Sequence, residues 1–316
     1  MTSIHGERTV PGVSIIIPTF QGSAYLGDTL AAIRTQDYPA PIEIIAVDSG
    51  STDGTLDILK QYNATVVEIP PQNFSHGYAR NLGARWANQP ILVFMSQDAV
   101  PVGTDWLRGM VVSLDDPQIA AAYARQMPRP DATPLEAFAQ IYMYPPQSKY
   151  YALYDDEPVT LERIFFSNVC SVTRRDIALA FPFNQTLIMS EDQAFAKELL
   201  LAGYTTYYNA DVCVIHSHQY SLPKLFCRNF DSAYSLHGVT DDSGRDLAWR
   251  GVRYIIHEIG YLLREREWQW LGYVPFYEAA RVLGRLCGSH AHWLSRSWLP
   301  SFSLNRAYWA RESLYY

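Results

Sequence analysis

The feature that most constrains the fold of this chain is a regular alternation of short apolar runs with helical patterns, extending from Val13 to about Gln126. The apolar runs are rich in Ile and Val, and they occupy residues 13–18, 42–47, 65–70 and 91–96. Helical spacing of apolar residues follows each run, in residues 27–36, 51–63, 76–89 and 104–114. Because strands that alternate with helices of about 10–15 residues pair in parallel, this pattern predicts a doubly wound α/β sheet. Ligands bind beyond the carboxyl ends of strands in such sheets, which directs attention to Thr19, Asp48 and Asp98.

The pattern changes after Gln126. Strand-like runs cover residues 120–126, 167–175 and 205–218, and a helix predicted over residues 190–203 ends with Gly203 in the C′ position. After Ser221 the chain becomes mostly helical, in residues 222–236, 246–267 and 274–286. We therefore predict a first domain over residues 1–220 and a helical, aromatic-rich region over residues 221–316.

The composition excludes several function classes. The chain has 25 Lys and Arg against 32 Asp and Glu, whereas a protein that grips nucleic acid presents a basic surface, so we expect no nucleic-acid partner. Four widely spaced cysteines (Cys170, Cys213, Cys227 and Cys287) indicate reduced thiols in a cytoplasmic protein. No apolar run has the length of a signal peptide or of a membrane span. We expect a cytoplasmic protein that at most lies on a membrane surface.

Two predicted turns carry side chains that suit a nucleotide. Asp48 ends a buried strand, where a carboxylate can accept hydrogen bonds from a ribose or a base, and the turn that follows exposes helix N–H groups. Arg80 lies near a predicted helix start in the segment FSHGYARNLG, and a guanidinium binds phosphate through two hydrogen bonds. A capped turn and a solvated helix face are the structural alternatives for these two segments.

Three further groups could perform chemistry. Asp98 follows an apolar strand directly, and a lone carboxylate in a crevice suits a hard divalent cation. Glu191 and Asp192 begin a predicted helix, whose dipole would keep one carboxylate ionised and able to take a proton from an alcohol. His216 and His218 are two residues apart on a predicted strand, so both imidazoles would face one side and could address one cation. Capping, dipole and surface roles are the structural alternatives, and no zinc-type spacing occurs.

The order of these segments resembles the inverting nucleotide-sugar glycosyltransferases of glycosyltransferase family 2, which have the GT-A fold. The resemblance covers Val13 to about Tyr220. Residues 13–39 resemble the opening strand and helix of that family, IIAVDSGSTDGT its second-strand signature, and SEDQAF its Glu-Asp catalytic segment. MSQDA stands where the family carries Asp-x-Asp, with Ser96 in place of the first Asp. FSHGYARN, SQDA and HSHQYS together are similar to bacterial rhamnosyltransferases that use dTDP-L-rhamnose.

This resemblance implies a GT-A type, Rossmann-like sheet that binds a nucleotide sugar, with a mainly helical C-terminal region. It implies a nucleotide pocket lined by Pro18, Thr19, Asp48, Ser49, His76, Arg80 and Gln97. Asp98 would hold Mg²⁺ or Mn²⁺ at the diphosphate, and His216 or His218 would add a further metal ligand or a contact with the diphosphate. Asp192 would be the general base, supported by Glu191. Because Ser96 supplies no carboxylate, the resemblance leaves the metal dependence open.

The resemblance also implies a reaction. A sugar, L-rhamnose from dTDP-L-rhamnose in the first instance, would be moved with inversion onto a hydroxyl of a glycan or lipid-linked saccharide in polysaccharide biosynthesis. A UDP-hexose is the alternative donor. A sugar-nucleotide pyrophosphorylase should carry a Gly-rich basic loop where this chain has PTFQGSAYL. A non-catalytic carbohydrate-binding protein would not need Asp192 at a helix start beside a metal-type Asp98.

The C-terminal third contains six of the eight tryptophans. Residues 246–267 place an apolar set at helical spacing, which predicts an apolar face: Trp249, Val252, Ile255, Ile256, Ile259, Leu262 and Leu263. We expect this face to pack on its own domain. The alternatives are a peripheral contact with the inner face of the membrane and contact with a second subunit in a homodimer.

Overall fold

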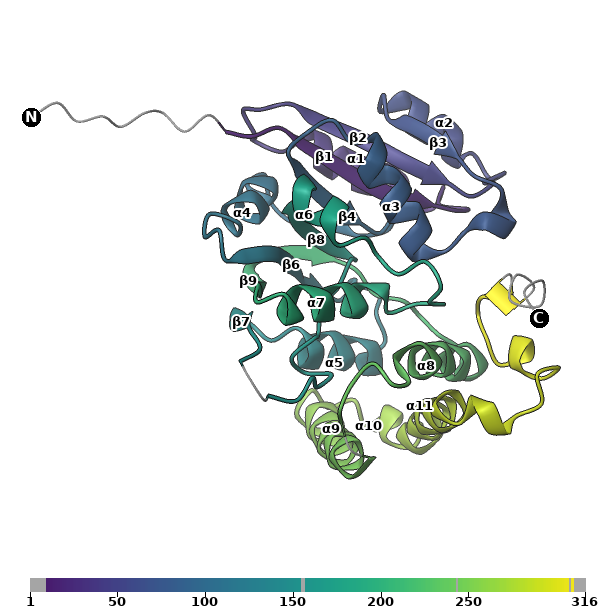
Figure 1. Ribbon diagram of the computed structural model, residues 1–316. Helices are drawn as coiled ribbons and strands as arrows, with labels where there is room; N and C mark the ends of the chain where they lie inside the picture. Colours follow the sequence, from purple (N-terminus) through teal and green to yellow (C-terminus); the bar gives the residue numbers. More distant parts are fainter. Residues whose placement is uncertain (1–9, 155–156, 243, 307, 310–316) are drawn as a thin grey trace, which may run out of the picture.

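The computed structural model describes residues 10–154, 157–242, 244–306 and 308–309, and it shows one mixed sheet with helices on both faces (Figure 1). The strand order is β3-β2-β1-β4-β8-β6-β9-β5, and β7 pairs with β9. The strands are β1 (Val13–Thr19), β2 (Ile42–Asp48), β3 (Thr65–Glu68), β4 (Ile91–Met95), β5 (Val100–Pro101), β6 (Ile119–Met127), β7 (Lys149–Tyr151), β8 (Cys170–Arg174) and β9 (Thr205–Ile215).

The predicted parallel half of the sheet is confirmed. Strand β1 pairs in parallel with both β2 and β4, and β2 pairs in parallel with β3. The second half is mixed, because β8 runs antiparallel to its neighbours β4 and β6, whereas β6 and β9 are parallel. The sequence predicted β9 to extend through His218, but the strand ends at Ile215, so both histidines lie in the segment that follows it.

The helices of the α/β part agree with the sequence pattern in place, although several are shorter. They are α1 (Leu26–Arg34), α2 (Thr55–Gln61), α3 (His76–Trp86), α4 (Trp106–Val112), α5 (Pro134–Met143), α6 (Arg175–Ala180) and α7 (Glu191–Leu201). Two helices begin later than the predicted ranges 51–63 and 104–114: α2 follows Gly54, whose φ is 91°, and α4 follows Asp105. Gly203 has the left-handed φ of 84° that its predicted C′ position requires.

Apolar layers lie on both faces of the sheet, as a doubly wound fold requires. One layer packs α1, α2 and α4 against the sheet through side chains such as Leu30, Leu59 and Trp106. The other layer packs α3, α6 and α7 against the opposite face through Ala84, Ile177 and Phe195. Because both faces are covered, β1, β2 and β4 read as nearly continuous apolar runs in the sequence.

The C-terminal region packs helices α8 (Leu222–Leu236), α9 (Gly244–Arg264), α10 (Trp268–Leu271) and α11 (Val274–Ser289) beneath the sheet (Figure 1). Leu135 of α5 shares a core with Leu225 and Leu262, so the α/β part and the helical region are joined by apolar contacts. The boundary near Ser221 coincides with the N-cap of α8. Whether the two parts are separate domains stays a prediction.

The expectation that the apolar face of α9 packs internally is confirmed for Leu262 and wrong for most of the other residues of that face. The buried face of α9 consists of Tyr254, Glu258 and Leu262, which are four residues apart and lie on one side of the helix. Ile255 is half-buried, whereas the remaining residues of the predicted face form a stripe that faces solvent, with Trp249 66% exposed and Ile256 61% exposed: Trp249, Val252, Ile256, Ile259 and Leu263. None of the helices in the described ranges is long and apolar enough to cross a membrane.

Helices α8 and α11 approach each other closely at two glycines. A Cβ atom added to Gly284 would lie 2.4 Å from the carbonyl oxygen of Phe226, and one added to Gly288 would lie 2.3 Å from that of Phe230. These obstacles are backbone atoms of α8, which cannot rotate away as a side chain can. The two glycines therefore set the distance between the helices.

We expect Gly284→Ala to destabilise the protein by about 1–3 kcal/mol, because the added methyl group pushes α11 away from α8. Thermal unfolding of the purified variant measures the change. Gly260→Ala is the matched control, since nothing lies within 4 Å of its added Cβ on α9. That substitution should be neutral or slightly stabilising. Equal melting temperatures for the two variants would contradict the close contact.

Candidate active site

The carboxyl ends of β1 and β2 form a tightly bonded turn around Asp48. One carboxylate oxygen, Oδ1, accepts hydrogen bonds from the backbone N–H groups of Gly50 and Ser51 at 2.9 and 2.8 Å. The other, Oδ2, accepts from the hydroxyl groups of Thr19 and Ser51 at 2.9 and 2.6 Å. Asp48 has no exposed surface, and Thr19 and Ser49 are almost as buried. This carboxylate is thus committed to the shape of the turn, and a direct contact with a ligand would have to replace one of its bonds.

Gln97 joins this turn to the segment that carries Asp98. Its side-chain carbonyl accepts a hydrogen bond from the backbone N–H of Phe20, and its amide group donates to the carbonyl of Phe20, each at 3.0 Å. The sequence predicts that Gln97 contacts the nucleotide, but both polar atoms of its side chain are bonded to the backbone of Phe20. Through Gln97, the end of β1, where Pro18 and Thr19 lie, is fixed beside Asp98.

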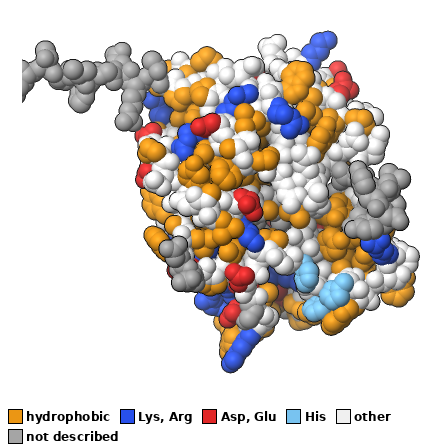
Figure 2. Space-filling view, in the orientation of Figure 1, with side chains coloured by type: hydrophobic (Ala, Val, Ile, Leu, Met, Phe, Trp, Pro, Cys, Tyr) orange, Lys and Arg blue, Asp and Glu red, His pale blue; other side chains and the backbone are white. Residues whose placement is uncertain are grey.

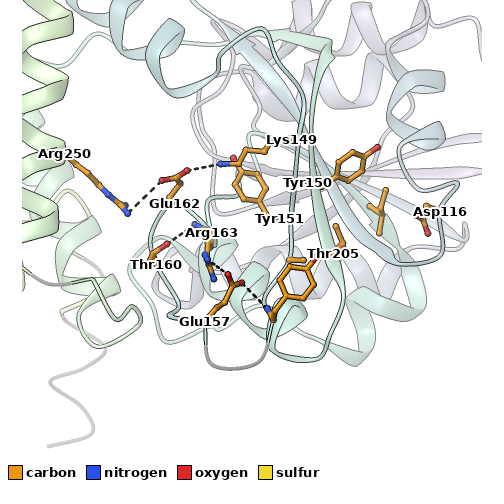
Figure 3. A pocket seen from close by; sticks show the side chains of 13 residues that line it. Asp116, Lys149, Tyr150, Tyr151, Glu157, Thr160, Glu162, Arg163, Thr205 and Arg250 are labelled. Atoms are coloured by element: carbon orange, nitrogen blue, oxygen red, sulfur yellow. Dashed lines mark hydrogen bonds and ion pairs between the residues drawn. The ribbon is translucent and has the colours of Figure 1, made fainter.

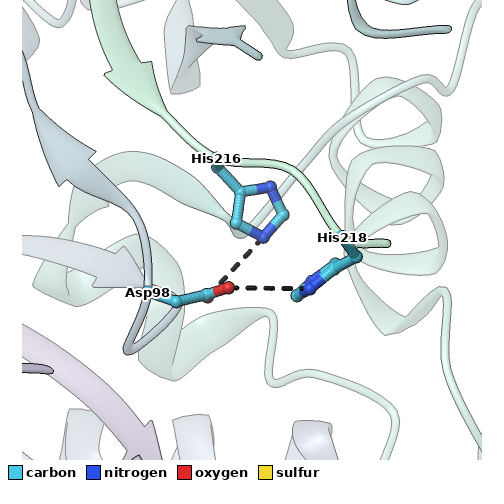
Figure 4. Close-up of side chains that lie close together, drawn as sticks. All are labelled: Asp98, His216 and His218. Carbon is cyan, nitrogen blue, oxygen red and sulfur yellow. Dashed lines mark ion pairs between the residues drawn. The ribbon is translucent and has the colours of Figure 1, made fainter. Parts of the chain in front are cut away.

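Asp98, His216 and His218 come together beyond the ends of β4 and β9 (Figure 4). The short strand β5 pairs with the end of β9, Val100 opposite Ile215, and this register brings the turn after β4 beside the residues after β9. His216 Nε2 lies 3.6 Å from Asp98 Oδ1, and His218 Nδ1 lies 3.7 Å from Asp98 Oδ2. One ligand atom from each residue falls within 4.8 Å of the others.

Gln126 fixes the orientation of His216. Its side-chain carbonyl lies 2.9 Å from His216 Nδ1, and its amide group donates to the hydroxyl groups of Tyr144 and Ser167 at 2.5 and 2.9 Å. Since the amide hydrogens are used by the two hydroxyls, the carbonyl must accept the proton of Nδ1. The lone pair of Nε2 then points toward Asp98. Such a hydrogen bond to the far nitrogen is the usual support of a metal-binding histidine.

The three side chains fit a divalent cation. His216 is buried, and its Nε2 has no hydrogen-bond partner in the described structure. Burial lowers the pKa of His216 to about 4 and lowers that of His218, although the charge of Asp98 opposes both shifts. Both imidazoles are therefore neutral at pH 7, so their contacts with Asp98 are not ion pairs. Two neutral imidazole nitrogens and one carboxylate are a set of ligands that a divalent metal accepts.

Arg80 and Glu191 form a buried ion pair between α3 and α7. Arg80 Nη1 lies 2.5 Å from Glu191 Oε1, and each side chain is only 6% exposed. Burial alone would raise the pKa of Glu191, but the charges of Arg80 and His76 outweigh it and hold the pKa below its usual value. Glu191 thus stays ionised. The charge of Arg80, which the sequence predicts to contact a diphosphate, is therefore already neutralised by Glu191, although its Nε has no hydrogen-bond partner among the described residues.

Asp192 lies next to this pair and behaves differently. Burial and the negative charge of Glu191 raise the pKa of Asp192 to about 6. The helix dipole, which the sequence suggests as the cause of ionisation, is not what distinguishes the two carboxylates. Arg80 lowers the pKa of Glu191, whereas the pKa of Asp192 is raised. Asp192 Oδ2 accepts a hydrogen bond from the backbone N–H of Asn168 at 3.2 Å. A half-buried carboxylate with a pKa near 6 is suited to accept a proton at neutral pH.

A short segment before β8, Ser167–Asn168–Val169, forms hydrogen bonds both to Asp192 and to residues that support the Asp98, His216 and His218 cluster. Ser167 Oγ accepts from Gln126, the Asn168 N–H donates to Asp192, and the Val169 carbonyl accepts from the N–H of Ser96. The predicted base and the predicted cation site are therefore anchored to three consecutive residues. The sequence predicted a strand from Ser167 onward, but β8 begins only at Cys170.

The sequence identified the Asp98, His216 and His218 cluster and the Glu191–Asp192 pair, and the structure brings each set together. It missed the supporting residues Gln126 and Ser167. The available signal for Gln126 was a polar side chain at the end of the Ala-rich, strand-like run AAAYARQ. Ser167 gave no such signal, because nothing in FFSNVC distinguishes a site loop from a strand.

A cavity of about 700 Å³ lies away from these residues (Figure 3). It includes Ile119 and Thr205, the first residues of the parallel strands β6 and β9, whereas His216 follows the last residue of β9. Most of its charged side chains pair with one another, as in the contact of Lys149 with Glu162 at 2.8 Å. The chemistry-bearing groups are at the opposite, carboxyl end of the sheet, where an α/β fold binds ligands.

Comparisons with known proteins place this geometry in context. The model of the family described as Glycosyl transferase family 2 matches residues 14–179. The O-antigen chain rhamnosyltransferase RfbN of Salmonella typhimurium is 31% identical over 303 residues, which cover 94% of this chain and 96% of that protein. The O-antigen chain rhamnosyltransferase WbaN of Salmonella anatum is 30% identical over 306 residues, with 95% and 96% covered.

A similar solved structure is the mannosyltransferase PcManGT from Pyrobaculum calidifontis, in complex with GDP-Man and Mn²⁺. It aligns with 96% of this chain and 86% of its own at a TM-score of 0.56 and 18% identity. At that identity the likeness supports the fold alone. The predicted GT-A type sheet with a helical C-terminal region is confirmed.

We expect Gln126→Met to weaken binding of Mn²⁺ about 10–100-fold, because loss of the acceptor for Nδ1 leaves the ring of His216 free to turn. Calorimetric titration of the purified variant with Mn²⁺ measures the effect. Gln118→Met, an exposed position at the other end of β6, is the matched control and should bind as the unmodified protein does. Unchanged affinity in a folded Gln126→Met variant would contradict this role of Gln126.

Proposed function

This chain belongs to glycosyltransferase family 2, and on that premise we propose that it moves a sugar with inversion from a nucleoside diphosphate onto an acceptor hydroxyl, with Asp192 as the general base. The observation that carries the proposal is that the predicted base and the predicted cation site are held by the same short segment. Asp192, with a pKa near 6, and the cluster of Asp98, His216 and His218 are both bonded into the segment 167–169 or its immediate partners.

We propose that Asp192 acts directly on the acceptor, whereas Glu191 acts through its charge. Asp192 takes the proton of the acceptor hydroxyl as its oxygen attacks the anomeric carbon. The bond from that carbon to the diphosphate oxygen breaks on the opposite face, and its electron pair leaves with the nucleoside diphosphate. A single displacement of this kind inverts the anomeric configuration. Glu191 supports the base indirectly, because its charge keeps the pKa of Asp192 raised.

A divalent cation fits the site, and Asp98, His216 and His218 would hold it. Bound there, it would neutralise charge on the diphosphate oxygens. Of Mg²⁺ and Mn²⁺ we propose Mn²⁺, because Mg²⁺ prefers oxygen ligands and two of the three groups are imidazoles. Since Ser96 offers no carboxylate, the two histidines would supply the additional ligands.

The donor is proposed to be dTDP-L-rhamnose, with a UDP-hexose as the alternative. Support for rhamnose comes from the two relatives named as rhamnosyltransferases, which match almost the whole chain. The same names suggest an O-antigen saccharide as the acceptor. The nucleoside would lie over the ends of β1 and β2, where Pro18, Thr19, Asp48 and Ser49 shape the floor, with His76 and Gln97 at its sides.

The purified protein should release nucleoside diphosphate from dTDP-L-rhamnose when Mn²⁺ and an acceptor saccharide are present. Asp192→Asn should lower this rate by about 10²–10⁴, because the amide cannot accept the proton. The rate of the unmodified protein should fall below about pH 6, since the raised pKa of Asp192 means that the base is protonated there. A coupled assay for nucleoside diphosphate measures all three quantities.

Asp176→Asn is the matched control, because this carboxylate begins α6, outside the groups described above. It should leave the rate unchanged. If nucleoside diphosphate is released only from UDP-hexoses, the donor is a UDP-hexose and not dTDP-L-rhamnose. An active Asp192→Asn variant, or an acid limb at the ordinary pKa of an aspartate, would refute the assignment of the base.

We further propose that the exposed stripe of α9 lies on the inner face of an anionic membrane. Residues 1–220 carry 13 Lys and Arg against 23 Asp and Glu, whereas residues 221–316 carry 12 against 9. The basic part of the chain is thus the part that exposes Trp249, Trp268, Trp293 and Trp298. Figure 2 shows apolar and basic side chains exposed together on the lower part of the molecule. Apolar and aromatic groups among basic residues are typical of helices that lie in a membrane interface.

We expect the protein to float with vesicles that contain phosphatidylglycerol. Replacing both Trp249 and Ile256 by Ala should weaken this binding about tenfold, which corresponds to roughly 1.4 kcal/mol of apolar burial. Trp86→Ala is the matched control, since Trp86 is 54% exposed on α3, outside the C-terminal region. Absence of vesicle binding would contradict the proposal. A dimer that the double substitution converts to a monomer would assign the stripe to a second subunit instead.

A further inference from the structure

A departing diphosphate carries several negative charges, and transferases place a guanidinium or an ammonium group beside it in addition to a metal ion. Arg80 is the obvious candidate from the sequence. In the structure, however, its charge is matched by Glu191 at 2.5 Å within a pair that is almost fully buried. Within the described residues its Nε has no hydrogen-bond partner, but a diphosphate that drew the guanidinium away from Glu191 would leave an unpaired buried charge, which is costly.

Arg129, which follows β6, is also engaged. Its Nη2 donates to the backbone carbonyl of Asp98 at 2.5 Å, and its guanidinium lies 4.3 Å from the ring centre of Tyr25. These contacts hold the turn of Asp98 in place. Arg129 therefore supports the cation site, and one of its guanidinium N–H groups is already bonded to the backbone of Asp98.

Arg228 on α8 is placed differently. It is exposed, and within the described ranges its hydrogen-bond partner is the thioether sulfur of Met189, a weak acceptor. Met189 lies just before Glu191 and Asp192, and its N–H donates to Ser235 Oγ of α8 at 3.3 Å. The segment just before α7 is therefore bonded to the middle of α8 at Arg228 and to its end at Ser235. This contact puts the guanidinium of Arg228 beside the segment that carries the base.

The charge of Arg228 also reaches both sides of the site. It is among the causes that lower the pKa values of His76 on α3 and of His216 and His218 after β9. In each case burial is the larger cause, and the position of Arg228 beside the site is given by its contact with Met189. A cation so placed, with a weak partner, has most of its five N–H donors available to a ligand.

We infer that Arg228 binds the diphosphate of the nucleotide sugar and stabilises it as the leaving group. This inference rests on the proposed function. The guanidinium exchanges its weak contact with Met189 for charge-assisted hydrogen bonds to phosphate oxygens. As the bond between the anomeric carbon and the phosphate oxygen breaks, the electron pair remains on that oxygen, near Arg228, while the proton of the acceptor passes to Asp192. The helical region thus contributes directly to the transfer site.

The test compares ligands that differ by one phosphate. Calorimetry in the presence of Mn²⁺ gives the affinities for dTDP and dTMP, and for UDP and UMP, in the full-length protein. Arg228→Ala should weaken the diphosphate ligands at least about tenfold and leave the monophosphates nearly unchanged. It should also lower the turnover number by about 10²–10³, as expected for loss of one group that stabilises developing negative charge. Arg228→Lys should restore part of both losses.

Lys224→Ala is the matched control, because Lys224 is exposed one turn earlier on α8 and should affect neither ratio nor rate. Since Arg228 is exposed, its variants should melt at the temperature of the unmodified protein. An unchanged ratio of diphosphate to monophosphate affinity in Arg228→Ala would overturn the inference and leave the proposed function intact. Failure of the unmodified protein to bind any of these nucleotides would overturn both.

Discussion

The buried ion pair between Arg80 and Glu191 is the interaction on which the rest of the site depends. It joins α3 to α7 in a place with little access to water, where loss of either partner costs about 3–5 kcal/mol. It also decides how two adjacent carboxylates differ. Glu191 is held ionised by Arg80, and its charge, together with burial, raises the pKa of Asp192. One pair of opposite charges thus produces a base that works near neutral pH.

The topology explains why these groups meet. Strands β1, β2 and β4 run in parallel, so their carboxyl ends lie along one edge of the sheet. The chain then crosses to the far side of the sheet, where β5 pairs with β9 and brings Asp98 to His216. The segment 167–169 fills the space between these ends and bonds to both groups. The site is therefore a property of the sheet edge, and its parts come from residues more than a hundred positions apart.

The sequence predicted the sheet half from β1 to β4 and the residues with unusual chemistry, because apolar periodicity and isolated polar groups at strand ends are local signals. It could not predict which polar groups would neutralise one another. Arg80 and Glu191 are 111 positions apart, and no local pattern records their contact. For the same reason Arg228 went unnoticed, since on a helix alone it reads as one more exposed arginine. The exposure of the α9 stripe was missed because periodicity shows that a face is apolar but not what covers it.

The central claim is that one displacement, with Asp192 as the base, transfers the sugar. The anomeric configuration of the product tests it most directly. After transfer from dTDP-L-rhamnose to an acceptor saccharide, the one-bond coupling between the anomeric carbon and its proton distinguishes the two configurations by NMR. The account predicts the configuration opposite to that of the donor. A product that keeps the configuration of the donor would contradict it, because a single displacement cannot retain it.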